Sequence, residues 1–375
     1  MSAKKYAPVS WTKTKPLDIA RPPEVRPETT GLIAPDGRSA IDWRPAGETN
    51  GWKPTPFAIQ NPEPIRLESL IALPDGSLVG NACQYAGFFR YHPDSKKVEF
   101  FGKSGPSAPC LALAGGKVYI DGYPNTVLSV YDPAKPWTAT AASGGKQEGD
   151  NPKWLGTLGQ GCAEAHHCKA LVDGGNGRVY LMGQRERWST GTGLGYYDTA
   201  TGKFFGLGTE NKDLNPLGLA VLSKAGRVVF SGVPRSGGDA RLVVYDLDLK
   251  VASRLEIFPG QATGGQLFTS DRDAQFLGCL LNPKTGKTML YRYDLAAGRI
   301  DAQAEAPAAE LSWVGLRPAD GTWWCLAGGT LYALDAKTLE TRPRFSVEGE
   351  LAYPNWVGKD IYATRGGDVV RVAVP

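Results

Sequence analysis

Residues 169–208, KALVDGGNGRVYLMGQRERWSTGTGLGYYDTATGKFFGLG, contain the pattern that decides the fold. An apolar run is followed by a Gly-rich turn, a second apolar run, a loop, and then an aromatic-Asp turn with a further short run after it. Short apolar runs separated by Gly, Asp and Asn are typical of antiparallel strands joined by tight turns. The stretch therefore predicts one small sheet of four strands.

The same order of features recurs along most of the chain. The tyrosines of the recurring turn are separated by 40, 66, 48 and 48 residues, and they are Tyr91, Tyr131, Tyr197, Tyr245 and Tyr293. Four short strands in each repeat of about 40 to 50 residues is the signature of a β-propeller, in which each blade buries its faces against its neighbours. Six complete copies and one truncated copy predict an all-β, seven-bladed β-propeller of four-stranded antiparallel blades.

Irregularities in the repeats predict the domain organisation. The long gap between two of the turn tyrosines indicates an insert near 138–161, and the last copy lacks an outer strand. We expect a strand from residues 30–67 to pair into that last blade and close the ring, because closure removes exposed strand edges. Residues 1–26 hold several Pro and charged residues without periodicity, which predicts an extended arm. The remaining residues, 27–375, are predicted to form a single propeller.

Composition limits the class of function. The 375 residues include 47 Gly and 28 Pro, and the net charge of +4 is too small and too dispersed to indicate nucleic-acid binding. No apolar run approaches the roughly 18 residues that a membrane span needs, and the first residues lack the apolar core of a signal peptide. We expect a soluble protein with no membrane span. Its location stays open between the cytoplasm and secretion with the signal already removed.

Candidate binding residues gather in equivalent loops of several blades. In a propeller, the loops that join the second and third strands share one face with the loops that enter the innermost strands, and that face is where sites normally form. The residues that the repeats place in second-to-third-strand loops are Gln84, Tyr85, Tyr123, Arg185, Arg187, Arg235 and Arg365. His166 and His167 precede the innermost strand of the third blade. We expect arginines and histidines to converge on this face.

The adjacent histidines are the sharpest local feature, because the chain has only three His. Imidazole titrates near neutrality, so His166 or His167 is a candidate general base. Adjacent residues on a strand point to opposite faces, which lets at most one of them face the channel and makes the other a packing residue. Tyr123 is a candidate proton donor or sugar-stacking ring, with packing between blades as the alternative.

The paired arginines suggest what the ligand would be. Arg185 and Arg187 are separated by one residue, so at a strand end their guanidinium groups would project to one side, and such a fork suits carboxylate, sulfate or phosphate. The alternative is a pair of structural bridges to acidic turns of the neighbouring blade. The repeated Asp turns, at Asp132, Asp198, Asp246, Asp294 and Asp335, are interpreted as structural, because a catalytic group would not recur in five blades.

The cysteines do not predict a metal site. Cys162, His166, His167 and Cys168 carry the ligand types that zinc prefers, but their spacing is not a standard zinc pattern and no second ligand pair follows. A disulfide between Cys162 and Cys168 is a further minor alternative. We expect buried free thiols, no metal and no cofactor.

The segments GRVYLMG and GLGYYDTATGKFF, together with the turn LSVYDPAKPW, resemble bacterial seven-bladed propellers of the streptogramin-lyase-like and lactonase-like groups and the propeller polysaccharide lyases. The polysaccharide lyases use His or Tyr as base and acid and Arg to neutralise the uronate carboxylate. That resemblance implies such roles for His166 or His167, Tyr123, Arg185 and Arg187. The other two groups use a metal held by acidic or His residues, and this chain offers no clear set of them.

Two hypotheses follow from the sequence. In the first, the propeller binds an anionic small molecule or acidic glycan on its arginine-bearing face and acts as a carbon-oxygen lyase that cleaves a uronate-containing polysaccharide by β-elimination. In the second, the chain is a non-enzymatic interaction propeller or a structural subunit, with a protein partner held through the N-terminal arm.

Overall fold

A computed structural model describes the chain as two compact units, Met1–Pro64 and Ile65–Pro375. The described residues are 25–27, 32–33, 39–45, 53–55, 66–82, 87–102, 107–123, 125–141, 147–158, 165–184, 192–208, 211–256, 267–269, 274–282, 285–308, 311–346 and 349–374. Every regular element that these residues form is a β-strand. The all-β class is therefore confirmed. Most of the predicted arm, residues 1–24, lies outside the described residues.

The first unit contains a small sheet of its own. Its strands are β1 (Val25–Pro27), β2 (Leu32–Ile33), β3 (Ser39–Pro45) and β4 (Lys53–Thr55). The longest of them, β3, pairs antiparallel with each of the other three. Three of them, β2, β3 and β4, fall in the range from which the sequence predicted a ring-closing strand, and the described pairings of all four are with one another.

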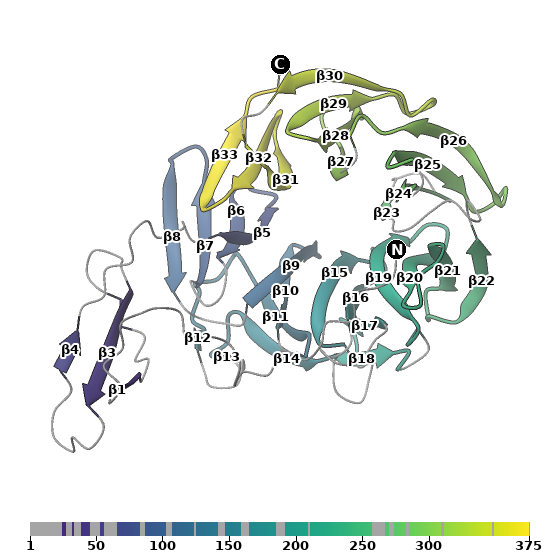
Figure 1. The fold of residues 1–375 in the computed structure, drawn as a ribbon. Coiled ribbons are helices and arrows are strands. Elements are labelled where there is room, and N and C mark those ends of the chain that lie inside the picture. The colour runs from purple at the N-terminus through teal and green to yellow at the C-terminus, as the bar shows by residue number, and fades with distance from the viewer. Residues whose placement is uncertain are drawn as a thin grey trace. The chain divides into compact units, whose positions relative to one another are not determined.

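The second unit is a ring of seven antiparallel blades, which confirms the predicted seven-bladed propeller (Figure 1). Blades 1 to 3 comprise β5 (Leu67–Ala72), β6 (Leu78–Ala82), β7 (Gly87–His92) and β8 (Lys97–Gly102); β9 (Ser107–Ala114), β10 (Lys117–Tyr123), β11 (Val127–Tyr131) and β14 (Lys153–Thr157); and β15 (His167–Asp173), β16 (Arg178–Gln184), β17 (Thr192–Asp198) and β18 (Lys203–Gly206). Blades 4 and 5 comprise β19 (Leu214–Leu222), β20 (Arg227–Pro234), β21 (Arg241–Asp246) and β22 (Val251–Glu256); and β23 (Leu267–Thr269), β24 (Gln275–Leu281), β25 (Thr288–Asp294) and β26 (Arg299–Glu305). Blades 6 and 7 comprise β27 (Leu311–Leu316), β28 (Trp323–Ala327), β29 (Thr330–Leu334) and β30 (Thr341–Ser346); and β31 (Ala352–Val357), β32 (Asp360–Arg365) and β33 (Asp368–Val372).

The insert belongs to blade 2. It contains a short hairpin, β12 (Thr140–Ala141) and β13 (Gln147–Glu148), between the third and fourth strands of that blade. The outer strand β14 falls inside the range that the sequence assigned to the insert, and it completes the blade. Asn151 fixes the loop, because its side-chain amide donates to the carbonyl oxygens of Asp132, Lys135 and Pro136 at 2.9 to 3.1 Å.

Apolar packing between neighbouring blades holds the ring together. Seven clusters of buried apolar side chains each occupy one of the seven interfaces between blades. Four tryptophans contribute to the clusters of blades 5, 6 and 7, and they are Trp313, Trp323, Trp324 and Trp356. Burial of apolar side chains contributes about 25 cal/mol for each Å² removed from water, so this radial packing stabilises the ring without any helix.

Contacts between blades 7 and 1 complete the ring. In the described residues, blade 7 has three strands. Much of 30–67 lies outside the described residues, so closure by a strand from that range stays a prediction. The innermost strand of blade 1, β5, lies against β31 and β32 of blade 7. The backbone N–H of Leu67 donates to the carbonyl of Gly366 at 2.9 Å, and Asn355 exchanges hydrogen bonds with the backbone of Ala72 and Leu70.

The repeated Asp turns are structural, as the sequence predicted. In each of them the carboxylate accepts backbone N–H groups of the residues that follow, as Asp198 does from Ala200 and Thr201 at 3.0 and 2.9 Å. These donors stabilise the ionised form and lower the pKa of Asp198 below its ordinary value.

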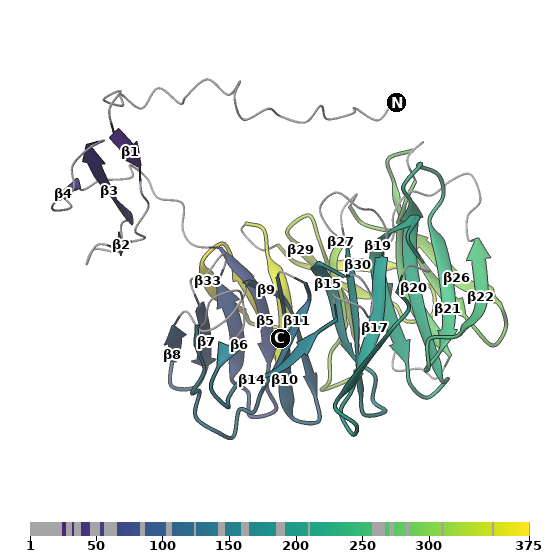
Figure 2. The same cartoon turned by 90° about the horizontal axis from the view of Figure 1, so that it is seen from below.

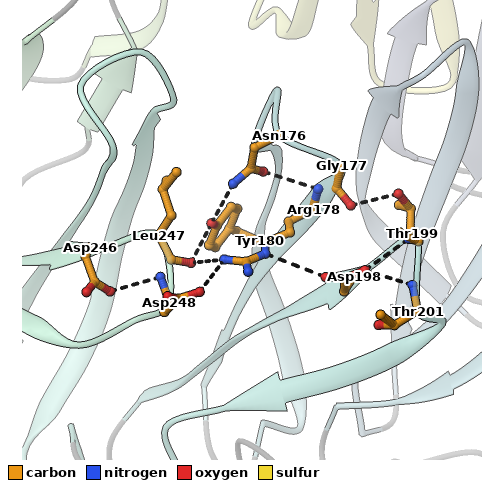
Figure 3. Close-up of polar contacts among 11 residues, drawn as sticks. Asn176, Gly177, Arg178, Tyr180, Asp198, Thr199, Thr201, Asp246, Leu247 and Asp248 are labelled. Carbon is orange, nitrogen blue, oxygen red and sulfur yellow. Dashed lines mark hydrogen bonds and ion pairs between the residues drawn. The ribbon is translucent and has the colours of Figure 1, made fainter.

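Arginines connect these turns to the preceding blade. Arg178 in blade 3 donates to the carbonyl of Leu247 at 2.6 Å and lies 2.8 Å from Asp248, both in a turn of blade 4 (Figure 3). Arg90 makes an equivalent bond to the carbonyl of Pro133, and Arg292 does so to that of Ala336. In all three cases the acceptor is the residue directly after the turn Asp, so the turns serve as inter-blade anchors.

Candidate functional site

The topology places the described candidate residues on one face of the ring. Tyr123 ends β10, Arg235 follows β20 and Arg365 ends β32, so each lies where a second strand turns into a third. His166 directly precedes β15, the innermost strand of blade 3, on the same face. Figure 2 shows the blades edge-on, with the strand ends on two opposite faces. Gln84, Tyr85, Arg185 and Arg187 lie outside the described residues.

The structure brings three of these residues together between blades 2 and 3. The rings of Tyr123 and His167 are stacked, with centroids 4.6 Å apart and an interplanar angle of 21°. His166 meets both rings edge-on, at 5.0 Å from each centroid. All three side chains are half-buried, so the cluster is open to solvent on one side. The exposed Arg235 and Arg365 belong to blades 4 and 7.

Asn125 orients the His166 imidazole. Its Oδ1 lies 2.9 Å from Nδ1 of His166. An amide oxygen can only accept a hydrogen bond, so this contact requires the proton on Nδ1. The lone pair of the neutral ring then lies on Nε2. The imidazole is thereby held in a tautomer that can accept a proton at Nε2.

The turn that carries Asn125 is strained. Asn125 and Thr126 have φ angles of 63° and 46°, in the left-handed region, which is unfavourable for a β-branched residue such as Thr. Hydrogen bonds hold the turn: the Thr157 hydroxyl donates to the Asn125 carbonyl, and the Thr126 hydroxyl donates to the carbonyl of Ala165 at 3.4 Å. Strained residues persist only where their surroundings fix them, and they concentrate at functional sites.

Gly183 lets the two blades approach each other beneath this turn. A Cβ at this position would lie 2.8 Å from the carbonyl oxygen of His167, 2.9 Å from Cβ of Ala165 and 3.0 Å from Cγ2 of Thr126. The two shortest contacts, both within blade 3, are closer than real Cβ atoms make, and the contact to Thr126 of blade 2 is tight, so any side chain would displace the start of β15 and crowd the Thr126 turn. Gly183 also pairs with Cys168 in the sheet, which places it one residue from the Gln184–His167 pair.

A buried carboxyl group lies next to the aromatic cluster. Asp121 is two residues before Tyr123 on β10, so the two side chains leave the same face of the strand, and Asp121 is completely buried. Neither of its carboxyl oxygens has a hydrogen-bond partner among the described residues. Burial raises the pKa of Asp121 to about 8, and the nearby Cys168 thiol offsets only part of this effect. Sequence reasoning missed this residue, although an Asp inside the apolar strand KVYIDGY was a visible signal.

A cavity lies at the opposite face of the same two blades. It has a volume of about 550 Å³ and is lined by the turns that join first and second strands, including Lys117, Tyr119, Asp173 and Arg178. None of the residues that the sequence selected lines it. Among its charged side chains, Arg178 is already bound to blade 4.

The described residues contain no group of three or more His, Cys, Asp or Glu side chains that could hold a metal ion. Cys162, one member of the zinc pattern considered from the sequence, lies outside them. In the part of the chain that the structure describes, no helix is long and apolar enough to cross a bilayer.

Comparison with solved structures shows the fold alone. Hydrazine synthase from Kuenenia stuttgartiensis is similar over 84% of this chain and 97% of that chain, with 11% identity and a TM-score of 0.62. Virginiamycin B lyase from Staphylococcus aureus, in a catalytically inactive His-to-Ala variant with quinupristin, is similar over 83% of this chain and 96% of that chain, with 14% identity and a TM-score of 0.58. A streptogramin B lyase is similar over 83% and 94%, with 12% identity and a TM-score of 0.54. The resemblance to streptogramin-lyase-like propellers is confirmed for the architecture. No family model matches the chain, and no curated protein sequence matches it.

Proposed function

We propose that the propeller binds an anionic ligand on the face that carries Tyr123, His166 and His167, and that it cleaves a carbon-oxygen bond of that ligand by β-elimination. The observation that carries the proposal is the oriented imidazole: Asn125 holds His166 with its Nε2 lone pair available, and the Tyr123 ring lies 5.0 Å away. A base beside a phenol is the pair of groups that an elimination needs. Strain in the turn that carries Asn125 is independent support.

The ligand class follows from the neighbouring loop. His166 donates its backbone N–H to the carbonyl of Gln184 at 2.8 Å, and Gln184 pairs with Thr192. Gln184 therefore lies next to His166, and together with its partner Thr192 it flanks residues 185–191, with Arg185 and Arg187, in the sequence. We assign these arginines to the carboxylate of an acidic glycan or small acid, because guanidinium groups bind carboxylates in bidentate fashion.

The reaction would proceed as follows. The arginines neutralise the carboxylate, which makes the adjacent C–H more acidic. Nε2 of His166 removes that proton, the electron pair forms a C=C bond, and the bond from the β-carbon to oxygen breaks. The Tyr123 hydroxyl protonates the departing oxygen. His167 has a positioning role, because its ring is stacked on the Tyr123 ring.

A structural neighbour supports a lyase of this architecture. The virginiamycin B lyase with which the chain shares its fold is named as catalytically inactive when a histidine is replaced by alanine. A histidine-dependent lyase is therefore compatible with a seven-bladed propeller, and we extend that idea to His166.

The test is a screen of the purified chain against acidic polysaccharides, following the absorbance of the unsaturated uronate product. With an active substrate, we expect His166→Ala to lower kcat by about 10² to 10⁴-fold, the usual contribution of a general base. Arg185→Ala with Arg187→Ala should raise KM and abolish turnover, with an unchanged melting temperature. His92→Gln, in the outer turn of blade 1, is the matched control. Absence of product across the panel, or full activity in His166→Ala, would refute the proposal.

A protein-binding role is the second proposal, and it rests on the outer edge of blade 1. On the edge strand β8, the side chain of Phe100 is 80% exposed and that of Val98 is 42% exposed. Exposed apolar edge strands are typical contact sites for another chain. We expect Phe100→Ser, or deletion of residues 1–26, to release a partner from the protein purified from its source. A monomer that neither change affects would contradict this role.

A further inference from the structure

Two thiols and the buried carboxyl form a group between blades 2 and 3 that the proposed reaction does not use. Cys110 on β9 is directly opposite Asp121 on β10, so both side chains leave the same face of blade 2. Cys168 on β15 approaches them from blade 3, where it is 4% exposed. The innermost strands β9 and β15 lie against each other at this point.

Both thiols of this group are reduced, and they lie beside a buried carboxyl. Cys110 and Cys168 are both free thiols, and the Cys168 thiol faces both Cys110 and Asp121. Burial raises the pKa of the Cys168 thiol well above its ordinary value, so this thiol needs a nearby base before it can react. The Asp121 carboxyl is placed to relay the thiol proton, because it lies directly opposite Cys110 on the neighbouring strand and beside the Cys168 thiol. Cys110 is partly exposed, which lets a small reagent reach it.

We propose that Cys110 and Cys168 are a redox-active pair that a hydroperoxide converts into a disulfide joining the innermost strands of blades 2 and 3, with the Asp121 carboxyl relaying the proton of Cys168 to the departing oxygen.

The chemistry balances in two steps. The Cys110 thiolate attacks one oxygen of the hydroperoxide, the O–O bond breaks, and Cys110 becomes a sulfenic acid with release of water or an alcohol. The Cys168 sulfur then attacks the Cys110 sulfur while its proton passes to one oxygen of the protonated Asp121 carboxyl, whose own proton is given up to the departing oxygen of the sulfenic acid. The S–O bond breaks, hydroxide leaves and takes up that proton, and the disulfide forms. Two thiols lose two electrons, and the hydroperoxide gains them.

The disulfide would form beside the proposed site, since His167 precedes Cys168 and Tyr123 lies two residues beyond Asp121. The inference does not rest on the proposed function, however, because its readout is the oxidation state of the sulfurs. A chain without lyase activity would still show it.

The experiment treats the full chain with hydrogen peroxide, blocks the remaining thiols by alkylation, and digests the protein without reduction for mass spectrometry. We expect a cross-linked peptide containing Cys110 and Cys168, two hydrogens lighter than the reduced pair. In Cys168→Ser, the sulfenic acid on Cys110 should persist and react with dimedone. Cys325→Ser removes a buried thiol in blade 6 and should leave the cross-link unchanged.

The role of Asp121 has its own readout. In Asp121→Asn, dimedone labelling of Cys110 should stay at the wild-type rate, while closure of the disulfide slows by at least about tenfold, the lower range for loss of a general acid–base group. Equal closure rates would overturn the role of the carboxyl. If the wild-type chain forms no Cys110–Cys168 cross-link, or if Cys110 pairs with another cysteine, the whole proposal fails.

Discussion

Replacement of Asp121 by Asn should remove a specific pH dependence of folding. The folded-state pKa of Asp121 is about 8, raised by burial from an ordinary value of 3.8. Below the ordinary value, both folded and unfolded chains carry the proton, and the stabilising contribution is fully present. As the pH rises from the ordinary pKa of 3.8 to the folded-state pKa of about 8, the unfolded chain loses the proton and the folded chain keeps it. In this window the free energy of unfolding therefore falls by about 1.4 kcal/mol per pH unit. Above the folded pKa, the loss levels off.

The magnitude can be measured against the variant. Between pH 5 and pH 8 the wild-type chain should lose about 3 to 4 kcal/mol relative to Asp121→Asn, because the amide does not titrate. Urea unfolding at several pH values, followed by tryptophan fluorescence, gives this difference, and groups common to both proteins cancel. Asp320→Asn is the matched control: backbone N–H donation from Thr322 lowers the pKa of the exposed Asp320, so its titration lies below the window. Parallel stability curves for Asp121→Asn and wild type would refute the reasoning.

Three further substitutions test how the ring is held. Asn151→Ala leaves the carbonyls of Asp132, Lys135 and Pro136 without this donor, and we expect it to lower the free energy of unfolding by roughly 2 to 4 kcal/mol in urea titrations. Gly183→Ala should cost about 1 to 3 kcal/mol through overpacking, and a shifted His166 resonance in NMR spectra would report the displaced start of β15. Arg178→Met removes the bond to the Leu247 carbonyl and should lower stability by about 1 to 3 kcal/mol, with faster amide exchange in the 246–250 turn. An unchanged midpoint in any of these would count against the contact concerned.

The sequence predicted the parts of the fold that repeat. Strand runs and turns recur in every copy and the Asp turns in five of them, so each interpretation could be checked several times within one chain. The contacts between blades 7 and 1 could not be predicted, because each occurs once: Asn355 and Leu70, like Gly366 and Leu67, lie far apart in the sequence, and nothing local marks their hydrogen bonds. The same limit applies to the site. Repeat position placed Tyr123 and His166 on one face, but the stacking of Tyr123 on His167 depends on two blades meeting.

Two unfavourable features occur together at the interface of blades 2 and 3, and stability alone does not account for them. Among the described residues, Asp121 is the one buried acid whose oxygens have no partner, since the other buried acid, Asp360, lies 2.5 Å from Arg371. Thr126, in the adjacent turn, holds a backbone conformation that a β-branched residue disfavours. An apolar side chain at the first position and a glycine at the second would relieve both costs. Local costs that the fold does not require are typical of functional positions. That both flank the cluster of Tyr123, His166 and His167 is the physical reason to look for chemistry at this interface before any other.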